Sequence, residues 1–220
     1  MARLVSIRYF INLLVLFSLS ALLPIWVVNV KAQTESQQQV APLTPTQQSR
    51  LTASDGTQND NFANAAAISG NTALIGANRQ PSQDNRGGAY VFVRTGASSW
   101  AQQQKLLPAD VVNGDTFGAA VAIDGDTAVV SAPIHKVNNI AGVGAVYVFV
   151  RNGTTWTQEQ ELTPNDGALN NQFGSAVAIA GNTIMVGEWM ATVGANSRQG
   201  AVYVFTRSPG GTTWTQVQKL

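Results

Sequence analysis

The chain repeats itself three times after residue 50, and this repetition limits its fold more than any other feature. Three sets of aromatic residues recur at spacings of 55 to 58 residues: Phe62, Phe117 and Phe173; Tyr90, Tyr147 and Tyr203; Trp100, Trp156 and Trp214. A fixed period of about this size is typical of propellers and solenoids, whose units stack because none can bury its apolar faces alone. The sequence therefore predicts three equivalent units, over residues 51–106, 107–162 and 163–220.

The second unit shows the strand pattern most clearly. An apolar run at 117–123 is joined to a second run at 127–131 by Asp124-Gly125-Asp126. Asp-Gly between two apolar runs is a strong hairpin signal, because glycine accepts the positive φ that a tight turn demands. A third strand is predicted at 145–151, where alternation places Tyr and Phe on one face and Val on the other.

The fourth strand of this unit is predicted at 155–162, with one face more polar than the other. Strict alternation gives the faces Trp156, Gln158, Gln160, Leu162 and Thr157, Glu159, Glu161. Glu159 and Glu161 are expected to blunt an outer, partly exposed edge. Four such strands per unit predict an all-β fold of three four-stranded antiparallel blades. Closed propellers have about four to eight blades, so an incomplete propeller is expected.

Short motifs then link the chain to a known family. Phe117-Gly118, Ser131-Ala132-Pro133 and Phe173-Gly174 stand at corresponding places in successive units, although Gly187-Glu188-Trp189 and Phe62-Ala63 depart from them. In this respect the chain resembles the FG-GAP repeat family, the bladed repeat of integrin α-subunit propellers and of many bacterial exported proteins. The resemblance implies a β-propeller and covers about residues 51–220.

Many members of that family hold calcium in an Asp-rich loop between the two motif elements. Calcium takes six to eight oxygen ligands, so such a loop needs several carboxylates. Here the corresponding segments are the short turns 69–71, 124–126 and 180–182, and two of the three contain no carboxylate. A plain hairpin turn is therefore expected at each, with no metal and no other cofactor.

The N-terminus has the pattern of a secretory signal peptide over residues 1–32. Arg3 and Arg8 precede an apolar stretch from Tyr9 to Val28, and Val30 and Ala32 suit a cleavage site before Gln33. The alternative is an uncleaved anchor, because 20 apolar residues can span a bilayer. Cleavage would leave no membrane span, and either reading predicts a secreted or cell-surface protein.

Residues 33–50 are rich in Gln, Thr and Pro, which predicts a linker. Its end is less uniform, because 44–51 can be aligned with 155–162, with Pro45 in place of Trp156. Two interpretations of this alignment remain: residues 44–51 are a degenerate copy of a fourth strand, or the resemblance arises by chance in a tract rich in Gln and Thr.

Few residues suggest chemistry. His135, the only histidine, lies in a loop and is expected to be solvated, and Asp55, Asp110 and Asp166 are expected to make local turn hydrogen bonds rather than three equivalent sites. The chain contains no G-x-S-x-G elbow, paired-histidine motif or phosphate loop, so no catalytic residue and no enzyme activity are expected.

Binding residues are sought instead in the long loops before each Tyr strand, at 78–88, 134–144 and 188–200. The candidates are Trp189, Met190, His135 and Lys136. An exposed Trp is a favoured contact residue, whereas Trp189 folded back onto its own blade would be structural.

The function expected from the sequence is non-enzymatic binding or adhesion outside the cell. An extracellular protein or glycan is the expected ligand. No lysine- or arginine-rich patch points to nucleic acid. A homodimer closing a six-bladed ring is one way to cover the uncovered end blades. A structural surface protein without a specific ligand, and a propeller module of a larger enzyme-bearing protein, remain alternatives.

Overall fold

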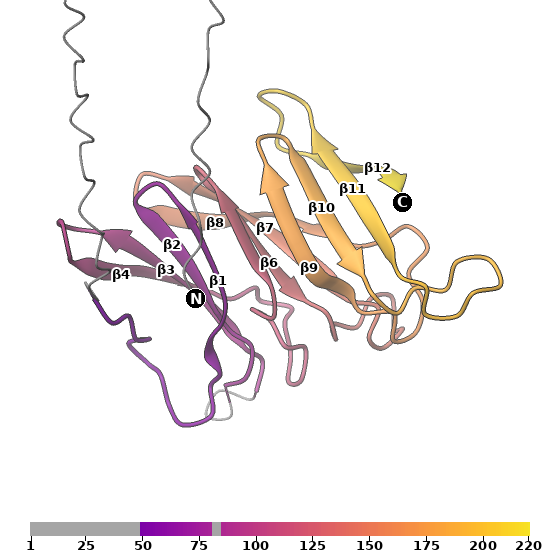
Figure 1. The fold of residues 1–220 in the computed structure, drawn as a ribbon, viewed down its shortest axis with the longest axis horizontal. Helices are drawn as coiled ribbons and strands as arrows, with labels where there is room; N and C mark the ends of the chain where they lie inside the picture. The colour runs from indigo at the N-terminus through magenta and orange to yellow at the C-terminus, as the bar shows by residue number, and fades with distance from the viewer. Residues whose placement is uncertain (1–48, 81–84) are drawn as a thin grey trace, which may run out of the picture. The chain divides into compact units, whose positions relative to one another are not determined.

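The structure, a computed structural model, describes residues 49–80 and 85–220. The predicted signal peptide and most of the predicted linker lie outside these residues. Within them the chain forms three four-stranded antiparallel sheets and no helix, and the sheets stand side by side (Figure 1). The predicted fold class, an unclosed set of three propeller blades, is confirmed.

Each blade is a meander of four strands, and the strand bounds repeat from blade to blade. Blade 1 contains β1 (Phe62–Ser69), β2 (Thr72–Ala77), β3 (Gly88–Arg94) and β4 (Trp100–Leu106). Blade 2 contains β5 (Val121–Asp124), β6 (Thr127–Ala132), β7 (Ala145–Asn152) and β8 (Thr155–Leu162). Blade 3 contains β9 (Phe173–Ala180), β10 (Thr183–Glu188), β11 (Ala201–Arg207) and β12 (Trp214–Lys219).

The first strands β1, β5 and β9 lie nearest to one another, and the contacts between neighbouring blades are concentrated there. Each first strand turns into the second through two residues, and the glycines of these turns, Gly70, Gly125 and Gly181, all have φ near +55°. The predicted hairpin turns are therefore present. The small residues of the first strands allow the close approach at the centre.

Both faces of β7 are buried, as its sequence predicts. Tyr147 and Phe149 pack in a core shared with blade 1, whereas Val146 and Val148 pack in a second core shared with blade 3. In each blade a Phe ring also meets the Tyr ring edge-on, at centroid distances of 5.4 to 5.6 Å. Adjacent blades are thus held together mainly by apolar burial.

The alternation predicted for β8 is wrong beyond Gln158. Val148 pairs with Gln160 and Phe149 pairs with Gln158, so Glu159 is an extra residue in a β-bulge. The bulge reverses the faces that follow it, and Leu162 packs toward blade 3 whereas Trp156 packs toward blade 1. The same register shift occurs in the fourth strands of blades 1 and 3.

Because of the bulge, the fourth strand reaches across to the next blade. Gln104 on β4 donates to the Trp156 carbonyl (2.7 Å) and accepts from the Trp156 N–H (2.8 Å). Gln160 holds the Trp214 backbone in the same way, at 2.9 and 2.7 Å. The predicted role of Glu159 as an edge charge is also wrong, because it pairs with Arg207 of blade 3 at 3.1 Å.

Glycine is required where the loop of one blade meets the first strand of the next. Gly144 has φ +89°, and a Cβ there would lie 2.1 Å from the Phe173 carbonyl oxygen. A Cβ on Gly87 would lie at the same distance from the Phe117 carbonyl oxygen. These two close approaches fix the spacing between successive blades.

Candidate functional site

Each blade carries a buried Tyr whose hydroxyl donates to an Asp that lies in a turn before the blade. The pairs are Tyr90–Asp55 (2.7 Å), Tyr147–Asp110 (3.1 Å) and Tyr203–Asp166 (2.8 Å). The expectation of only local turn hydrogen bonds is therefore wrong, because the partners lie 35 to 37 residues apart. The regular spacing of the three Asp residues reflects three equivalent places in the fold.

In blades 1 and 3 a lysine lies beside the Tyr–Asp pair and binds the Asp carboxylate. Lys105 lies 2.7 Å from Asp55, and Lys219 lies 2.5 Å from Asp166. Each lysine is paired directly with the Tyr of its blade across the strand ladder, and each ammonium also lies over the Tyr ring. Burial acts to raise the pKa of Asp166, but hydrogen bonds from Lys219 and Tyr203 outweigh it, so this pKa lies below its usual value.

Blade 2 differs because Glu161 stands where the other blades have lysine, directly across the ladder from Tyr147. His135, from the β6–β7 loop, fills the space beside it. The expectation of a solvated histidine is wrong, since His135 is only 8% exposed. Its partners come from segments 20 to 26 residues away in sequence.

The imidazole of His135 is held by a carboxylate on each side. Nδ1 lies 2.8 Å from Asp115 Oδ2, and Nε2 lies 3.8 Å from Glu161 Oε1. A carboxylate can only accept, so Nδ1 carries the proton and the Nε2 lone pair faces Glu161 in neutral His135. Donor atoms of Asp110, His135 and Glu161 all lie within 4.8 Å of one another.

The electrostatics of this cluster follow from burial and from the excess of carboxylates. The hydrogen bond to Asp115 raises the pKa of His135, against the effect of burial. Burial, and then the nearby charge of Asp110, raise the pKa of Glu161. In blade 3, burial raises the pKa of Glu188, which is fully buried beside the Tyr203 hydroxyl at 2.8 Å.

The long β2–β3, β6–β7 and β10–β11 loops emerge at one end of the blades (Figure 1). Trp189 in the third loop is 57% exposed, and its indole N–H donates to Gln172 Oε1 at 2.8 Å. Met190 is half-buried and Lys136 is exposed. Of the four candidate binding residues, Trp189 and Lys136 are therefore surface groups, whereas His135 belongs to the interior of blade 2.

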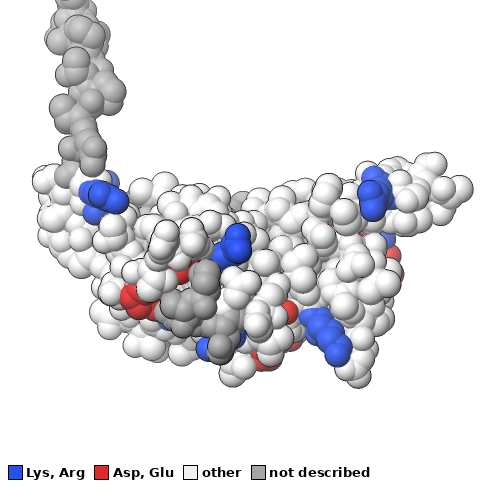
Figure 2. All heavy atoms as spheres, turned by 90° about the horizontal axis from the view of Figure 1, so that it is seen from below, with Lys and Arg blue, Asp and Glu red and all other residues white. Residues whose placement is uncertain are grey.

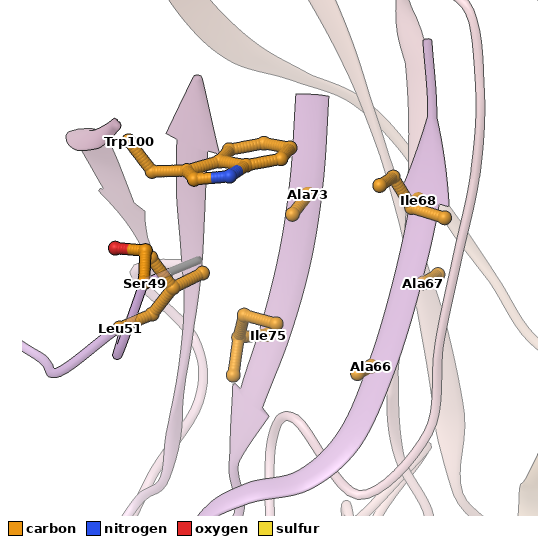
Figure 3. Close-up of a pocket in the computed structure, with 8 residues that line it drawn as sticks. All are labelled: Ser49, Leu51, Ala66, Ala67, Ile68, Ala73, Ile75 and Trp100. Carbon is orange, nitrogen blue, oxygen red and sulfur yellow. The ribbon is translucent and has the colours of Figure 1, made fainter. Parts of the chain in front are cut away.

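The outer face of blade 1 carries an apolar groove with a volume of about 450 Å³. Figure 3 shows its lining residues: Ser49, Leu51, Ala66, Ala67, Ile68, Ala73, Ile75 and Trp100. Ile68 is 62% exposed, whereas the equivalent Ile123 of blade 2 is 8% exposed under blade 1. On the far face of blade 3, Leu220 is 60% exposed, whereas the equivalent Leu162 is buried.

Lysine and arginine are scattered singly over the face seen in Figure 2. Several cations are engaged within the fold: Arg94, Arg151 and Arg207 lie over the Trp rings of their blades at 4.7 to 5.2 Å. No helix in residues 49–80 and 85–220 has the length and hydropathy to cross a membrane.

Comparison with known proteins agrees with this geometry. The FG-GAP repeat family model matches residues 45–92, 100–149 and 156–205, so the chain belongs to the FG-GAP repeat family. That repeat fold is generally non-catalytic. The first match begins at Pro45, within the predicted linker, whereas the others begin at Trp100 and Trp156. No curated protein matches the chain in sequence.

Proposed function

We propose that this chain is an exported, non-enzymatic binding or adhesion protein that presents ligand-contacting loops on one end of a rigid set of blades. The observation that carries the proposal is the exposure of Trp189 in the β10–β11 loop. Export is proposed from the N-terminal sequence, whose charged start, apolar stretch and small-residue cleavage site suit a secretory signal.

The loops stand on a scaffold that resists deformation. Each neighbouring pair of blades is joined by an apolar core, by a glutamine that holds the next Trp backbone, and by hydrogen bonds such as Phe173 N–H to the Val143 carbonyl at 2.8 Å. Binding residues are commonly carried on loops positioned by such a scaffold. Differences in loop sequence can then change the ligand without changing the blades.

Trp189 has the features of a preorganised contact residue. Its ring is largely exposed, yet its N–H is already fixed to Gln172, which reduces the entropy lost when a partner covers it. Tryptophan is enriched among residues that dominate binding energy. An extracellular protein or a glycan, whose apolar sugar faces stack on indole, would suit this surface.

The test is a screen of the purified chain on protein and glycan arrays, followed by titration of each ligand found. Trp189→Ala should weaken binding by at least about 30-fold, which corresponds to the roughly 2 kcal/mol that defines a dominant contact. Thr154→Ala, in the β7–β8 turn, is the control. Unchanged affinity in a folded Trp189→Ala variant would refute the loop assignment, and the absence of any saturable ligand would favour a structural protein instead.

The two outer faces favour a second role, in assembly, and we propose that a second copy of the chain covers them to close a six-bladed ring. Blade 3 offers Gln218 at the ladder position that Gln104 and Gln160 hold in blades 1 and 2. Blade 1 offers Trp100 at the position of their partners Trp156 and Trp214. Each outer face therefore presents one half of a junction that is formed twice inside the chain.

Light scattering on the purified chain tests this assembly. We expect twice the chain mass, and Ile68→Glu should give the single-chain mass because it places a charge in the apolar groove. Leu169→Glu, at a residue with similar exposure in the connection before β9, should leave the dimer intact. A wild-type chain that stays monomeric at all concentrations would rule out the second copy.

A further inference from the structure

The three Tyr–Asp places form an internal comparison that isolates an unusual feature of blade 2. In blades 1 and 3 the Tyr and the Asp are accompanied by a lysine ammonium at 2.7 or 2.5 Å from the carboxylate. In blade 2 the ammonium is replaced by the carboxylate of Glu161. The same position of the fold therefore loses a positive charge and gains a negative one.

His135 lies beside Glu161, and its chemistry differs from that of the lysine in the other two blades. Lysine offers only N–H donors, whereas neutral imidazole with its proton on Nδ1 offers a lone pair on Nε2. Asp115 Oδ2 lies 2.8 Å from Nδ1, and the same oxygen also accepts from the Val112 N–H at 2.8 Å, which fixes the carboxylate. The lone pair of Nε2 is thereby directed toward Glu161.

This arrangement is the one that metal sites use to orient a histidine ligand. Metal-bound imidazoles almost always donate their second N–H to a carboxylate, a carbonyl or water, which sets the tautomer and the ring orientation. Here the orienting carboxylate, Asp115, is in place, and it is a residue separate from Glu161 on the Nε2 side and from Asp110. The Tyr147 hydroxyl adds a hydrogen bond to Asp110 Oδ2, at 3.1 Å.

The distances suit a small divalent ion after modest adjustment. Donors around a tetrahedral Zn²⁺ with bonds of about 2.0–2.2 Å lie roughly 3.3–3.6 Å apart. The separation of His135 Nε2 and Glu161 Oε1 is 3.8 Å, and the widest separation in the set is within 4.8 Å. The Glu161 side chain is one-third exposed and Asp110 is exposed, so both can close on an ion, and water can enter as a fourth ligand.

The donor set also selects the kind of ion. Calcium prefers six to eight oxygens at 2.3–2.6 Å, which two carboxylates and one imidazole do not provide. A mixed set of one imidazole and two carboxylates suits zinc and neighbouring first-row divalent ions. This place lies beside the third and fourth strands of blade 2, away from the β5–β6 turn that corresponds to the family's calcium loop.

We propose that Asp110, His135 and Glu161 form a binding site for one divalent transition-metal ion, with Zn²⁺ as its expected occupant, and that Asp115 positions the histidine ligand. The ion takes the place of the lysine ammonium found in the other two blades. Because it joins the segment before blade 2, the β6–β7 loop and β8, its binding stabilises blade 2 and the loop that carries Lys136.

The test uses the untagged, purified chain, stripped with a chelator and titrated with Zn²⁺ by calorimetry, with metal content measured after dialysis. The chain has one histidine and no cysteine, so imidazole-dependent binding can arise only at His135. We expect one Zn²⁺ per chain and a rise in Tm with zinc concentration. Co²⁺ should give the visible absorption of a low-coordinate site with nitrogen and oxygen ligands.

Two substitutions separate ligation from folding. Glu161→Lys restores the arrangement of blades 1 and 3, so it should fold well, abolish stoichiometric zinc binding and remove the zinc-dependent rise in Tm. Asp115→Asn should weaken binding by about 10- to 100-fold, as loss of an orienting partner does. Asp166→Asn, the blade 3 counterpart of Asp110, should leave zinc binding unchanged.

The outcomes that overturn the proposal are equally specific. They are a folded wild-type chain without bound zinc, binding retained at full strength in Glu161→Lys, or an equal loss in Asp166→Asn. Since ligand binding through Trp189 is measured separately, failure of the zinc site leaves the proposed binding function untouched.

Discussion

Replacing Gly144 with alanine tests how the blades are joined. Gly144 has φ +89°, and an added Cβ would lie 2.1 Å from the Phe173 carbonyl oxygen, with the Phe173 nitrogen at 2.8 Å. Both contacts are to backbone, so no side chain can rotate away. Relief requires blade 3 to move relative to the loop of blade 2, which also strains the hydrogen bond from Phe173 N–H to the Val143 carbonyl.

The magnitude can be divided into two parts by a matched control. Gly153, in the β7–β8 turn, has φ +63° and nothing within 4 Å of an added Cβ. Gly153→Ala should therefore cost only the left-handed backbone contribution, about 1 kcal/mol. Gly144→Ala should cost that amount plus about 2–3 kcal/mol for overpacking against backbone, or roughly 3–4 kcal/mol in all.

Urea unfolding followed by tryptophan fluorescence measures both variants. The expected result is a lower midpoint for Gly144→Ala than for Gly153→Ala, with the difference reporting the contact between blades. If the free energies of unfolding of the two variants differ by less than about 0.5 kcal/mol, the close approach at Gly144 does not set the spacing of blades 2 and 3.

Three further changes test other parts of the structure. Ala63 has φ +68° where blades 2 and 3 have glycine, so Ala63→Gly should stabilise the chain by about 0.5–1 kcal/mol in thermal unfolding. Gln160→Ala removes both hydrogen bonds to the Trp214 backbone and should cost about 2 kcal/mol, whereas the exposed Gln158→Ala should cost under about 0.5; equal losses would contradict the clamp. Burial raises the pKa of Glu188 above its ordinary value, so the stability contributed by its protonated form is complete below about pH 4.5 and is lost as pH rises through the raised pKa. Glu188→Gln should thus be more stable than wild type at pH 8 and nearly equal to it at pH 4. The gain in the free energy of unfolding at pH 8 should be about 1.4 kcal/mol for each pH unit by which burial raises the pKa of Glu188, and a pH-independent difference would refute this.

The strands and turns of the blades were predictable because their signals are local. The Asp-Gly turn at 124–125 and the alternation of β7 depend on neighbouring residues, and both are found where the sequence places them. The faces of β8 were not predictable by alternation, because the bulge at Glu159 depends on how β8 pairs with β7.

The charged groups around His135 in blade 2 could not be predicted from the sequence pattern. His135 has no charged partner nearby in sequence except Lys136, and the structure surrounds it with Asp110, Asp115 and Glu161. One signal was available in advance: aligning the three units places Glu161 in register with Lys105 and Lys219. That alignment shows the exchange of charge, although not which groups would meet it.

The sequence by itself determined that this protein is built from three copies of one four-stranded unit. It could do so because hydrophobic period and turn residues act over a few positions and are repeated with the unit. The tertiary structure decided which residues meet between strands and between blades, and so gathered three carboxylates around a buried loop histidine. Such contacts depend on strand register and on the packing of whole blades, which no short stretch of sequence specifies.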